Sequence, residues 1–237
     1  MKLPATGREL ANLIDHTLLK PHVTIADLRN AIEFAHNFNC RGVCIPPFFV
    51  EKAREFLDKL CSKTRLVTVI GFPLGFHSVN TKISEIAFCK ALGADEFDVV
   101  MNINLFKSGD FECVLDELKK IVKIAHPCPV KVIIETAYLT SNEIKKACEI
   151  VIKSGAKYVK TCTGFGPRGV TKDDIILIKQ VVKNRIKIKA SGGIKTAAQA
   201  LELLVSGADI LGASRTKQIL DTFSPQLLKR FEKEQIN

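Results

Sequence analysis

Four charged residues stand inside short apolar runs that otherwise have the composition of buried β-strands. They are Asp98, Lys131, Lys160 and Lys189, within the runs EFDVV, VKVII, YVK and IKIK. Strands of a parallel sheet covered on both faces are expected to be almost entirely apolar. Because successive side chains of a strand point to opposite faces, all four can share the inner face while their neighbours face outward. The pattern predicts three lysines and one aspartate clustered inside the fold.

Such a cluster favours chemistry at a lysine amine. Burial or a neighbouring cation lowers the pKa of a lysine, so that its amine is partly neutral near pH 7 and can attack a carbonyl carbon to form a Schiff base. A second lysine sustains that lowered pKa by repulsion, and a carboxylate can move protons. Taken singly, each lysine has a plainer interpretation, in which it extends to solvent at a strand end or pairs with Glu135. Lys187 shares the parity of Lys189 but is expected at the solvated N-terminal rim.

Three glycine-bearing turns follow the last strand segments and predict a phosphate site. Backbone N–H groups of such turns, and the helix N-termini after them, bind phosphate oxygens where the last loops of an α/β barrel meet. A lone Gly-Gly pair is more often an ordinary turn, but three turns in this order favour a site. For Arg215, phosphate binding and a solvent-facing position are both open. The phosphate candidates are Gly164, Gly192, Gly193, Gly212 and Ser214.

The histidines and cysteines show no spacing typical of metal ligands. The five histidines are scattered, so we expect no metal and no cofactor, and we interpret His16 as structural. No Cys-x-x-Cys pair is present, so the cysteines are expected to be buried, reduced thiols, although Cys44 could line the site. The cysteines are Cys40, Cys44, Cys61, Cys89, Cys113, Cys128, Cys148 and Cys162.

The elements that must position these residues alternate between strands and helices along the whole chain. Apolar, β-branched runs predict strands over 13–17, 42–45, 66–70, 96–100, 130–134, 158–160, 186–189 and 209–211. Helical periodicity predicts helices over 25–38, 50–60, 80–91, 113–125, 196–205 and 216–220, with two more starting near Ser141 and Thr171. Three helices are followed by Gly93, Gly155 or Gly207, each typical of a residue that ends a helix.

Eight strand–helix units in 237 residues predict a single-domain TIM (β/α)8 barrel over residues 1–237. A doubly wound open sheet is the alternative, although it usually has five to seven strands. With 46% hydrophobic and 25% charged residues, the chain is typical of a soluble globular protein. No run reaches the roughly 20 apolar residues of a membrane span, and no secretory signal is visible, so we expect a cytoplasmic protein with no membrane partner.

The net charge of +10 fits either nucleic-acid binding or attraction of a small anionic substrate. A nucleic-acid-binding module should cluster its lysines and arginines among aromatic residues. Here the lysines are spread along the helices and aromatic residues make up only 7% of the chain. We therefore favour a phosphorylated small-molecule substrate and expect no nucleic-acid partner.

Six sequence blocks, in order, resemble the deoxyribose-phosphate aldolase family over almost the whole chain. They are LIDHTLLKP at 13–21, GFPLG at 71–75, GADEFDVVMNI at 93–103, KVIIET at 131–136, VKTCTGF at 159–165 and KASGGI at 189–194. The resemblance implies a metal-independent, class I aldolase on a TIM barrel. Such a lyase cleaves 2-deoxyribose 5-phosphate reversibly into glyceraldehyde 3-phosphate and acetaldehyde, in deoxyribonucleoside catabolism. It also implies a homodimer.

The same resemblance assigns roles to individual residues. Lys160 resembles the Schiff-base nucleophile, Lys189 the lysine that perturbs it, and Asp98 the carboxylate that relays protons. Lys131 is implied to join their network, and Asp15 to hold a substrate hydroxyl.

Further positions in the matching blocks are implied to contact the substrate. Thr163 is one of them, and the five phosphate candidates match the phosphate-binding turns. The chain departs from the family pattern where Arg215 follows Ser214, where Cys162 stands between two threonines, and at Asn104. At Arg215 the family pattern loses one hydroxyl and gains a cation, and none of these departures touches the lysine and aspartate set.

Overall fold

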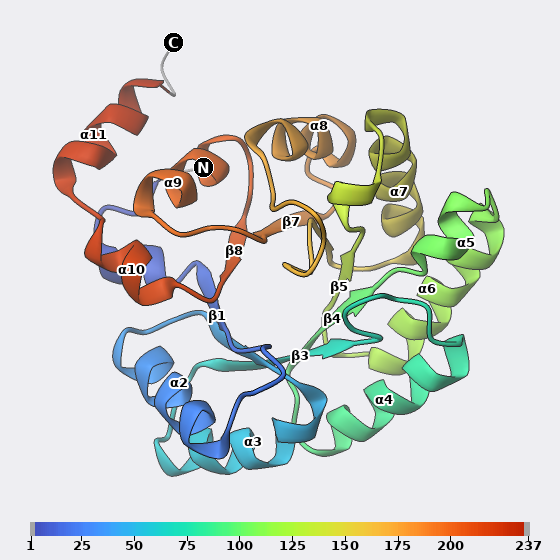
Figure 1. Cartoon of the computed structure of the whole chain (residues 1–237), viewed down its shortest axis with the longest axis horizontal. Coiled ribbons are helices and arrows are strands. Elements are labelled where there is room, and N and C mark those ends of the chain that lie inside the picture. The colour runs from blue at the N-terminus through green and yellow to red at the C-terminus, as the bar shows by residue number, and fades with distance from the viewer. Residues whose placement is uncertain (1–2, 235–237) are drawn as a thin grey trace.

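Eight parallel strands close into a barrel in the computed structural model, which describes residues 3–234. Each strand pairs with its neighbours in chain order, and the first pairs with the last (Figure 1). The closed barrel confirms the predicted TIM fold, and the open-sheet alternative is wrong. The strands are β1 Ile14–Thr17, β2 Gly42–Ile45, β3 Arg65–Ile70, β4 Glu96–Val100, β5 Val130–Ile133, β6 Tyr158–Lys160, β7 Lys187–Ser191 and β8 Ile210–Ala213.

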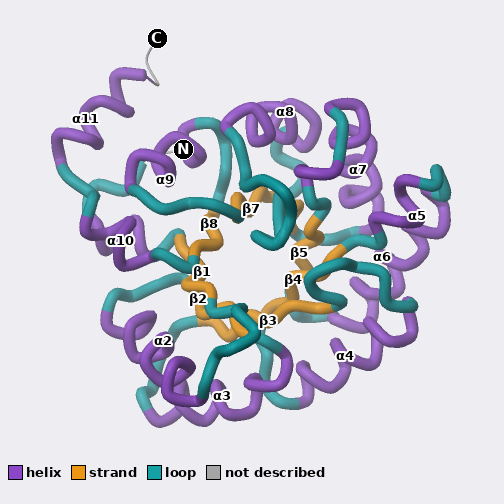
Figure 2. The backbone as a smooth tube through the Cα atoms, in the orientation of Figure 1, coloured by secondary structure: helices purple, strands orange, loops and turns teal. Residues whose placement is uncertain are grey.

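Helices form a ring outside the strands, as Figure 2 shows. The longer helices follow the predicted segments, whereas α1, α5 and α11 were not expected from the sequence. The helices are α1 Gly7–Ala11, α2 Ile25–Asn37, α3 Val50–Lys59, α4 Val79–Ala91, α5 Ile103–Lys107, α6 Phe111–Ala125, α7 Ser141–Ser154, α8 Lys172–Val182, α9 Ala197–Val205, α10 Thr216–Asp221 and α11 Pro225–Glu234, with 3₁₀ turns η1 Pro47–Phe49 and η2 Thr136–Tyr138.

Local signals explain where the helices begin and end. Thr24, Thr140 and Thr171 each cap a helix N-terminus and form a reciprocal hydrogen-bonded box with an acidic residue three positions later. Gly155, after α7, has a φ of 82°, a left-handed conformation that glycine adopts without strain. These caps fix the helix lengths and therefore the points at which the next strands start.

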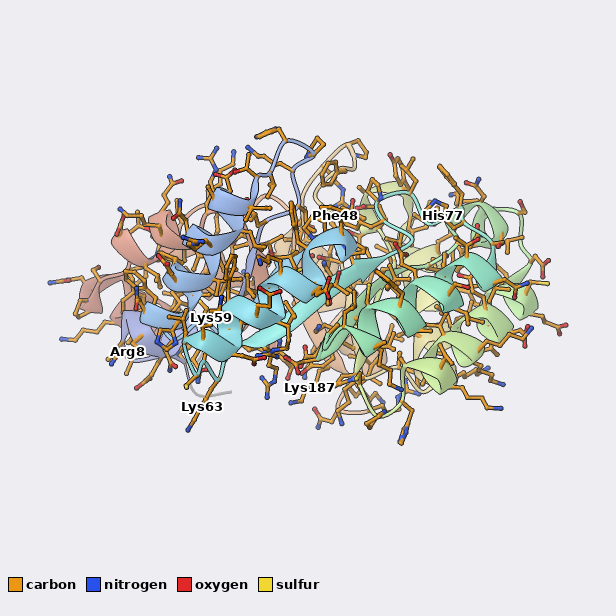
Figure 3. The ribbon with its side chains drawn as sticks, turned by 90° about the horizontal axis from the view of Figure 1, so that it is seen from below. Arg8, Phe48, Lys59, Lys63, His77 and Lys187 are labelled. Carbon is orange, nitrogen blue, oxygen red and sulfur yellow. The ribbon has the colours of Figure 1, made fainter. Side chains whose placement is uncertain are left out.

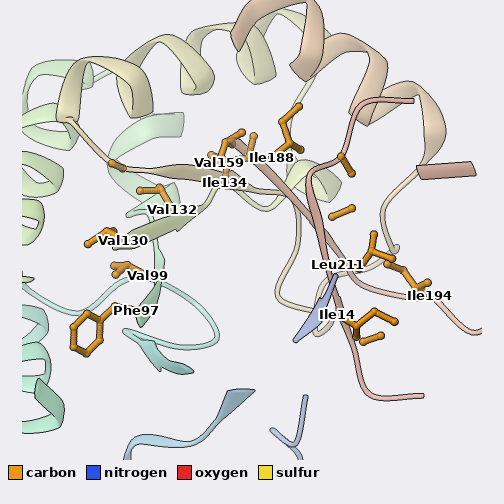
Figure 4. Close-up of a cluster of buried hydrophobic side chains, with 14 of the residues drawn as sticks. Ile14, Phe97, Val99, Val130, Val132, Ile134, Val159, Ile188, Ile194 and Leu211 are labelled. Atoms are coloured by element: carbon orange, nitrogen blue, oxygen red, sulfur yellow. The ribbon is translucent and has the colours of Figure 1, made fainter. Parts of the chain in front are cut away.

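The main hydrophobic core lies between the strands and the helices. In β4, Phe97 and Val99 face this layer, together with Val130 and Val132 of β5 (Figure 4). The residue between them, Asp98, is fully buried but lies outside that apolar cluster. The two-residue alternation therefore directs apolar side chains to the helices and charged ones to the lumen, as predicted.

Strand register brings the predicted lysines and aspartate together. Asp98 pairs with Lys131 across β4 and β5, and Lys160 pairs with Lys189 across β6 and β7. Partners in register on neighbouring strands project to the same face, so four sequence-distant residues share the lumen.

The two ends of the barrel differ in their side chains. Figure 3 shows Phe48 and His77 at one end, where the strands finish, and Lys63 and Lys187 at the other. Lys187 is exposed, as predicted for the N-terminal rim. In residues 3–234, no helix is long and apolar enough to cross a membrane.

Candidate active site

Asp98 is the centre of the buried cluster. Its Oδ1 accepts a hydrogen bond from Lys131 Nζ at 2.7 Å, and its Oδ2 accepts from Lys160 Nζ at 2.8 Å and Lys189 Nζ at 2.7 Å. All four side chains are almost completely inaccessible to solvent. The structure thus joins every member of the predicted lysine–aspartate set through one carboxylate. The plainer interpretation, in which these lysines extend to solvent or pair with Glu135, is wrong.

Lys189 also contacts a second carboxylate. Its Nζ lies 2.5 Å from Asp15 Oδ2. Burial by itself lowers the pKa of Lys189, but Asp15 and Asp98 outweigh burial and raise that pKa above its ordinary value. The general expectation that burial leaves these lysines with lowered pKa values is therefore wrong for Lys189. Lys189 remains an ammonium and supplies a fixed positive charge beside the Asp98 oxygen that it shares with Lys160.

The carboxylates remain ionised despite their burial. Desolvation opposes ionisation of Asp98, yet Lys131, Lys160 and Lys189 together hold its pKa well below the usual value. For Asp15, Lys189 and Arg41 likewise outweigh desolvation and lower the pKa to about 2. Asp98 is thus an ionised acceptor of three hydrogen bonds rather than a stored acid, and its role as a proton relay stays a prediction.

A cavity of about 550 Å³ opens at the C-terminal ends of β1, β6, β7 and β8. Lys160 is the member of the Asp98-centred set that lines it, while Asp98, Lys131 and Lys189 lie beneath its floor. This arrangement presents one amine to a ligand and keeps the other charges behind it.

The predicted phosphate residues meet at the wall of the same cavity, together with Thr163. Gly192 has a φ of 99°, and a Cβ there would lie 3.0 Å from Cys162 Cβ. Both the left-handed backbone and the close approach require glycine at this turn. The residues lining this part of the cavity are Gly164, Gly192, Gly193, Gly212 and Ser214.

Glycine is required at position 212 for a different reason. It lies inside β8, and a Cβ at this position would come within 3.1 Å of both Lys189 Cε and Ser191 Cβ. The missing side chain therefore makes room for the Lys189 stem. Gly212 also lines the cavity, so its assignment to phosphate binding stays a prediction beside this packing role.

Contacts add detail to two further assignments. Asp15 is fully buried and is not among the residues that line the cavity, and its two oxygens contact Arg41 and Lys189. It is therefore part of the charge network, and its contact with a substrate hydroxyl stays a prediction. Thr163 lines the cavity, but its hydroxyl and backbone N–H both donate to Glu135 Oε2. This contact fixes the loop after β6, so the immediate role of Thr163 is to shape the wall.

Sequence reasoning missed several contributors. Lys20 and Lys195 line the cavity and add positive charge. Arg215, for which the sequence left two positions open, is exposed and also lines the cavity, and its contact with phosphate stays a prediction. Their positions after β1, β7 and β8 were the available signal, since loops at these strand ends meet in a barrel. Arg41 and Glu96 were also missed, although Glu96 has the same parity as Asp98 within β4.

The remaining predictions concern histidine and cysteine. Burial lowers the pKa of His16 to about 4, and its Nδ1 lies 2.9 Å from Thr216 Oγ1, which fits the expected structural role. All eight cysteines are free, but the expectation that all are buried is wrong for Cys61 and Cys113, which are exposed, and for Cys128, which is half-buried. Cys44 is fully buried behind the cavity and does not line it.

Comparison with known proteins agrees with this geometry. The family model described as DeoC/LacD family aldolase matches residues 10–220. A deoxyribose-phosphate aldolase of Dictyoglomus turgidum is 43% identical over 213 residues, covering 90% of this chain and 96% of the relative.

Solved structures of aldolases are also similar to this chain. A deoxyribose phosphate aldolase from Aeropyrum pernix, described as tetrameric, is 32% identical with a TM-score of 0.86 and 92% coverage of both chains. An aldolase named QR15 is 38% identical, also with a TM-score of 0.86, over 94% of this chain and 98% of its own. With its closed barrel and its lysine-bearing cavity, the chain belongs to the DeoC/LacD family of aldolases.

Proposed function

We propose that this protein is a deoxyribose-phosphate aldolase, which cleaves 2-deoxyribose 5-phosphate reversibly into glyceraldehyde 3-phosphate and acetaldehyde. The observation that carries the proposal is the position of Lys160. Its amine lines a cavity whose rim carries three glycine-bearing turns, while its contact with Asp98 links it to the buried cations behind. The names of the similar proteins support the substrate.

Lys160 Nζ begins the reaction by attacking the C1 aldehyde of the open-chain sugar. A carbon–nitrogen bond forms, the carbonyl oxygen takes up a proton, and loss of water leaves an iminium ion. Lys189 supports this step because it contacts the same Asp98 oxygen, so Lys160 shares this carboxylate with a cation of fixed charge.

The iminium then accepts the electrons of the breaking carbon–carbon bond. A two-carbon and a three-carbon product require cleavage between C2 and C3, with loss of the proton from the C3 hydroxyl. Glyceraldehyde 3-phosphate leaves and an enamine remains on Lys160. Protonation at C2 and addition of water then release acetaldehyde and restore the amine.

Asp98 is placed to relay the protons of these steps. Its Oδ2 contacts Lys160 Nζ at 2.8 Å, so Asp98 can take a proton from this amine and return it with little movement, while Lys189 stays protonated beside the same oxygen. Lys131 holds the other oxygen and fixes the carboxylate plane.

The sugar phosphate is assigned to the end of the cavity formed by the turns after β6, β7 and β8. Gly164, Gly192 and Gly193 present backbone there, and Ser214 adds a hydroxyl. Lys20, Lys195 and Arg215 surround this end with positive charge, which favours a dianionic ligand.

The experiment is a direct assay of the purified protein with 2-deoxyribose 5-phosphate, measuring acetaldehyde and glyceraldehyde 3-phosphate separately. We expect both products in equal amounts. Turnover of a different sugar phosphate, with none of this one, would instead indicate another Schiff-base enzyme on the same barrel, such as a transaldolase or a dehydratase.

We also propose the biological setting that the family implies. The protein acts in the cytoplasm as a homodimer, in the breakdown of deoxyribonucleosides. Light scattering of the purified protein tests the dimer, and a tetramer such as that described for the Aeropyrum pernix aldolase would overturn it.

A further inference from the structure

Two buried residues at the N-terminal end of the barrel extend the charge network beyond the cavity floor. Arg41 directly precedes β2, and Glu96 is the first residue of β4. Their exposed fractions are 7% and 3%. Neither approaches the space in which a ligand would sit, since both line a separate depression at the opposite end of the barrel. A role in the reaction must therefore act through other residues.

Their contacts join the two ends of the network. Arg41 Nη1 lies 2.6 Å from Asp15 Oδ1, and Arg41 Nη2 lies 2.7 Å from Glu96 Oε1. Glu96 Oε2 lies 2.8 Å from Lys131 Nζ. Lys131 and Asp15 are already linked through Asp98 and Lys189, so the contacts close a ring. Around it the residues run Arg41, Asp15, Lys189, Asp98, Lys131, Glu96 and back to Arg41.

The ring alternates in sign and is electrically balanced. Its three cations are Arg41, Lys131 and Lys189, and each of its three carboxylates lies between two of them. Lys160 stands outside the ring as a fourth cation, and its partner oxygen on Asp98 is already shared with Lys189. A proton on Lys160 therefore gives this buried cluster an unbalanced positive charge, which is unfavourable in a medium of low dielectric constant.

Arg41 differs from the other cations because a guanidinium does not lose its proton in proteins. Its positive charge is permanent, and it neutralises carboxylate charge that would otherwise be available to the lysines. If Arg41 were neutral, three lysines would face three carboxylates, and Lys160 would hold its proton without an excess of charge. If Glu96 were neutral, four cations would face two carboxylates, and the proton on Lys160 would be still less favourable.

Other groups near the cluster do not change this balance of positive and negative charges. Cys44 Sγ lies 4.0 Å from Asp98 Oδ2, and burial raises the pKa of this thiol to about 11, so it is uncharged. Arg65 approaches Glu96 at 3.4 Å, but its side chain is 53% exposed and screened by water. The Tyr158 ring faces the cations from β6, about 6 Å from Arg41, Lys131 and Lys187.

We propose that Arg41 and Glu96 are positioning residues that set the pH range in which Lys160 acts as a nucleophile. They do so by balancing the ring, so that Lys160 is the one cation of the cluster without a carboxylate of its own. The inference rests on the proposed function only in requiring that Lys160 form the imine.

The test is the pH dependence of imine formation, measured by rapid mixing with 2-deoxyribose 5-phosphate and quenching with borohydride. Arg41→Met should move the midpoint of the rate profile to higher pH, and Glu96→Gln should move it to lower pH. Each shift should be about one pH unit, the size that one unit charge produces at roughly 10 Å in a protein interior. Opposite shifts are the signature, because loss of packing alone would slow both variants without moving their midpoints apart.

Two variants serve as controls. Arg41→Lys retains the charge and should retain the wild-type midpoint. Arg54→Met removes an arginine at the same end of the barrel that pairs with Asp58 on the surface, and its midpoint should also be unchanged. If Arg41→Met does not fold, the downward shift of Glu96→Gln decides the question.

The outcomes separate the two proposals. A wild-type enzyme that traps no sugar phosphate and releases no acetaldehyde would overturn the proposed function. A wild-type enzyme that is active, with Arg41→Met and Glu96→Gln sharing its midpoint or shifting in the same direction, would overturn the role of the ring and leave the aldolase assignment in place.

Discussion

Replacing Asp98 with asparagine should convert the centre of the site into a source of instability that disappears at high pH. The substitution removes one buried negative charge that contacts three lysine Nζ atoms at 2.7, 2.8 and 2.7 Å. The cluster can regain its balance by releasing a proton from one further lysine. At pH 7 this release costs about 4.6 kcal/mol, because an ordinary lysine pKa near 10.4 lies roughly 3.4 units higher and each unit is worth about 1.36 kcal/mol.

The pH dependence follows from the same proton. In the variant, the unfolded chain binds that proton and the folded protein does not, so the free energy of unfolding should rise with pH by about 1.36 kcal/mol per unit. The destabilisation relative to wild type should therefore shrink to about 1.9 kcal/mol at pH 9. In the wild type, Lys189 has a raised pKa, so its stabilisation is complete below pH 10.5 and is lost only at higher pH.

Urea unfolding of both proteins at pH 7, 8 and 9 measures this difference. Asp116→Asn is the matched control, since Asp116 is 61% exposed and pairs with Lys120 on the surface of α6. That control should change the free energy of unfolding by less than about 1 kcal/mol at every pH. A destabilisation by Asp98→Asn that is the same at all three pH values would refute the charge-balance reasoning.

The other predictions concern substitutions of two glycines, Gly42 and Gly192, and of Asp15. Gly42→Ala places a Cβ 2.8 Å from Asp15 Oδ1, so it should lower activity more than tenfold and the free energy of unfolding by about 1–3 kcal/mol. In the control Gly7→Ala the new Cβ has no described atom within 4 Å, so turnover should be unchanged. Gly192→Ala should raise KM for the sugar phosphate about tenfold with little change in kcat, while Gly109→Ala, equally left-handed but uncrowded, should not affect KM. The pKa of Asp15 is lowered from 3.8 to about 2, so above pH 3.8 its ionised carboxylate contributes roughly 2.4 kcal/mol to the free energy of unfolding. This contribution should be lost as the pH falls towards 2. In Asp15→Asn, the free energy of unfolding should not show that decrease on acid titration. A wild-type-like acid titration of this variant would contradict the assignment.

The barrel could be predicted from the sequence because each unit carries its own signals. Helix starts such as Thr24 and Thr171, and helix ends such as Gly155, are decided by contacts within a few residues. The two-residue alternation around Asp98 then determines which side chains face the lumen. Short elements such as α5 could not be foreseen, since their five residues have too few turns for a periodic pattern to appear.

The site could be predicted only in part for a related reason. Strand parity placed Lys160 and Lys189 on the inner face, but it does not give the depth of a residue along the barrel axis. The depth of each residue places Asp15 beneath the cavity floor and brings Gly212 against the stem of Lys189. Arg41 was missed because it precedes its strand, so its place in the ring depends on contacts across the barrel that no local pattern encodes.

The central claim is that Lys160 forms a covalent imine with the sugar phosphate. Mass spectrometry of peptides from the active enzyme, treated with borohydride and 2-deoxyribose 5-phosphate, tests it directly. We predict that the peptide containing Lys160 carries the reduced sugar phosphate or an ethyl group, and that the peptides containing Lys131 and Lys189 are unmodified. An active enzyme in which Lys160 stays unmodified, or in which Lys189 carries the adduct, would contradict this account.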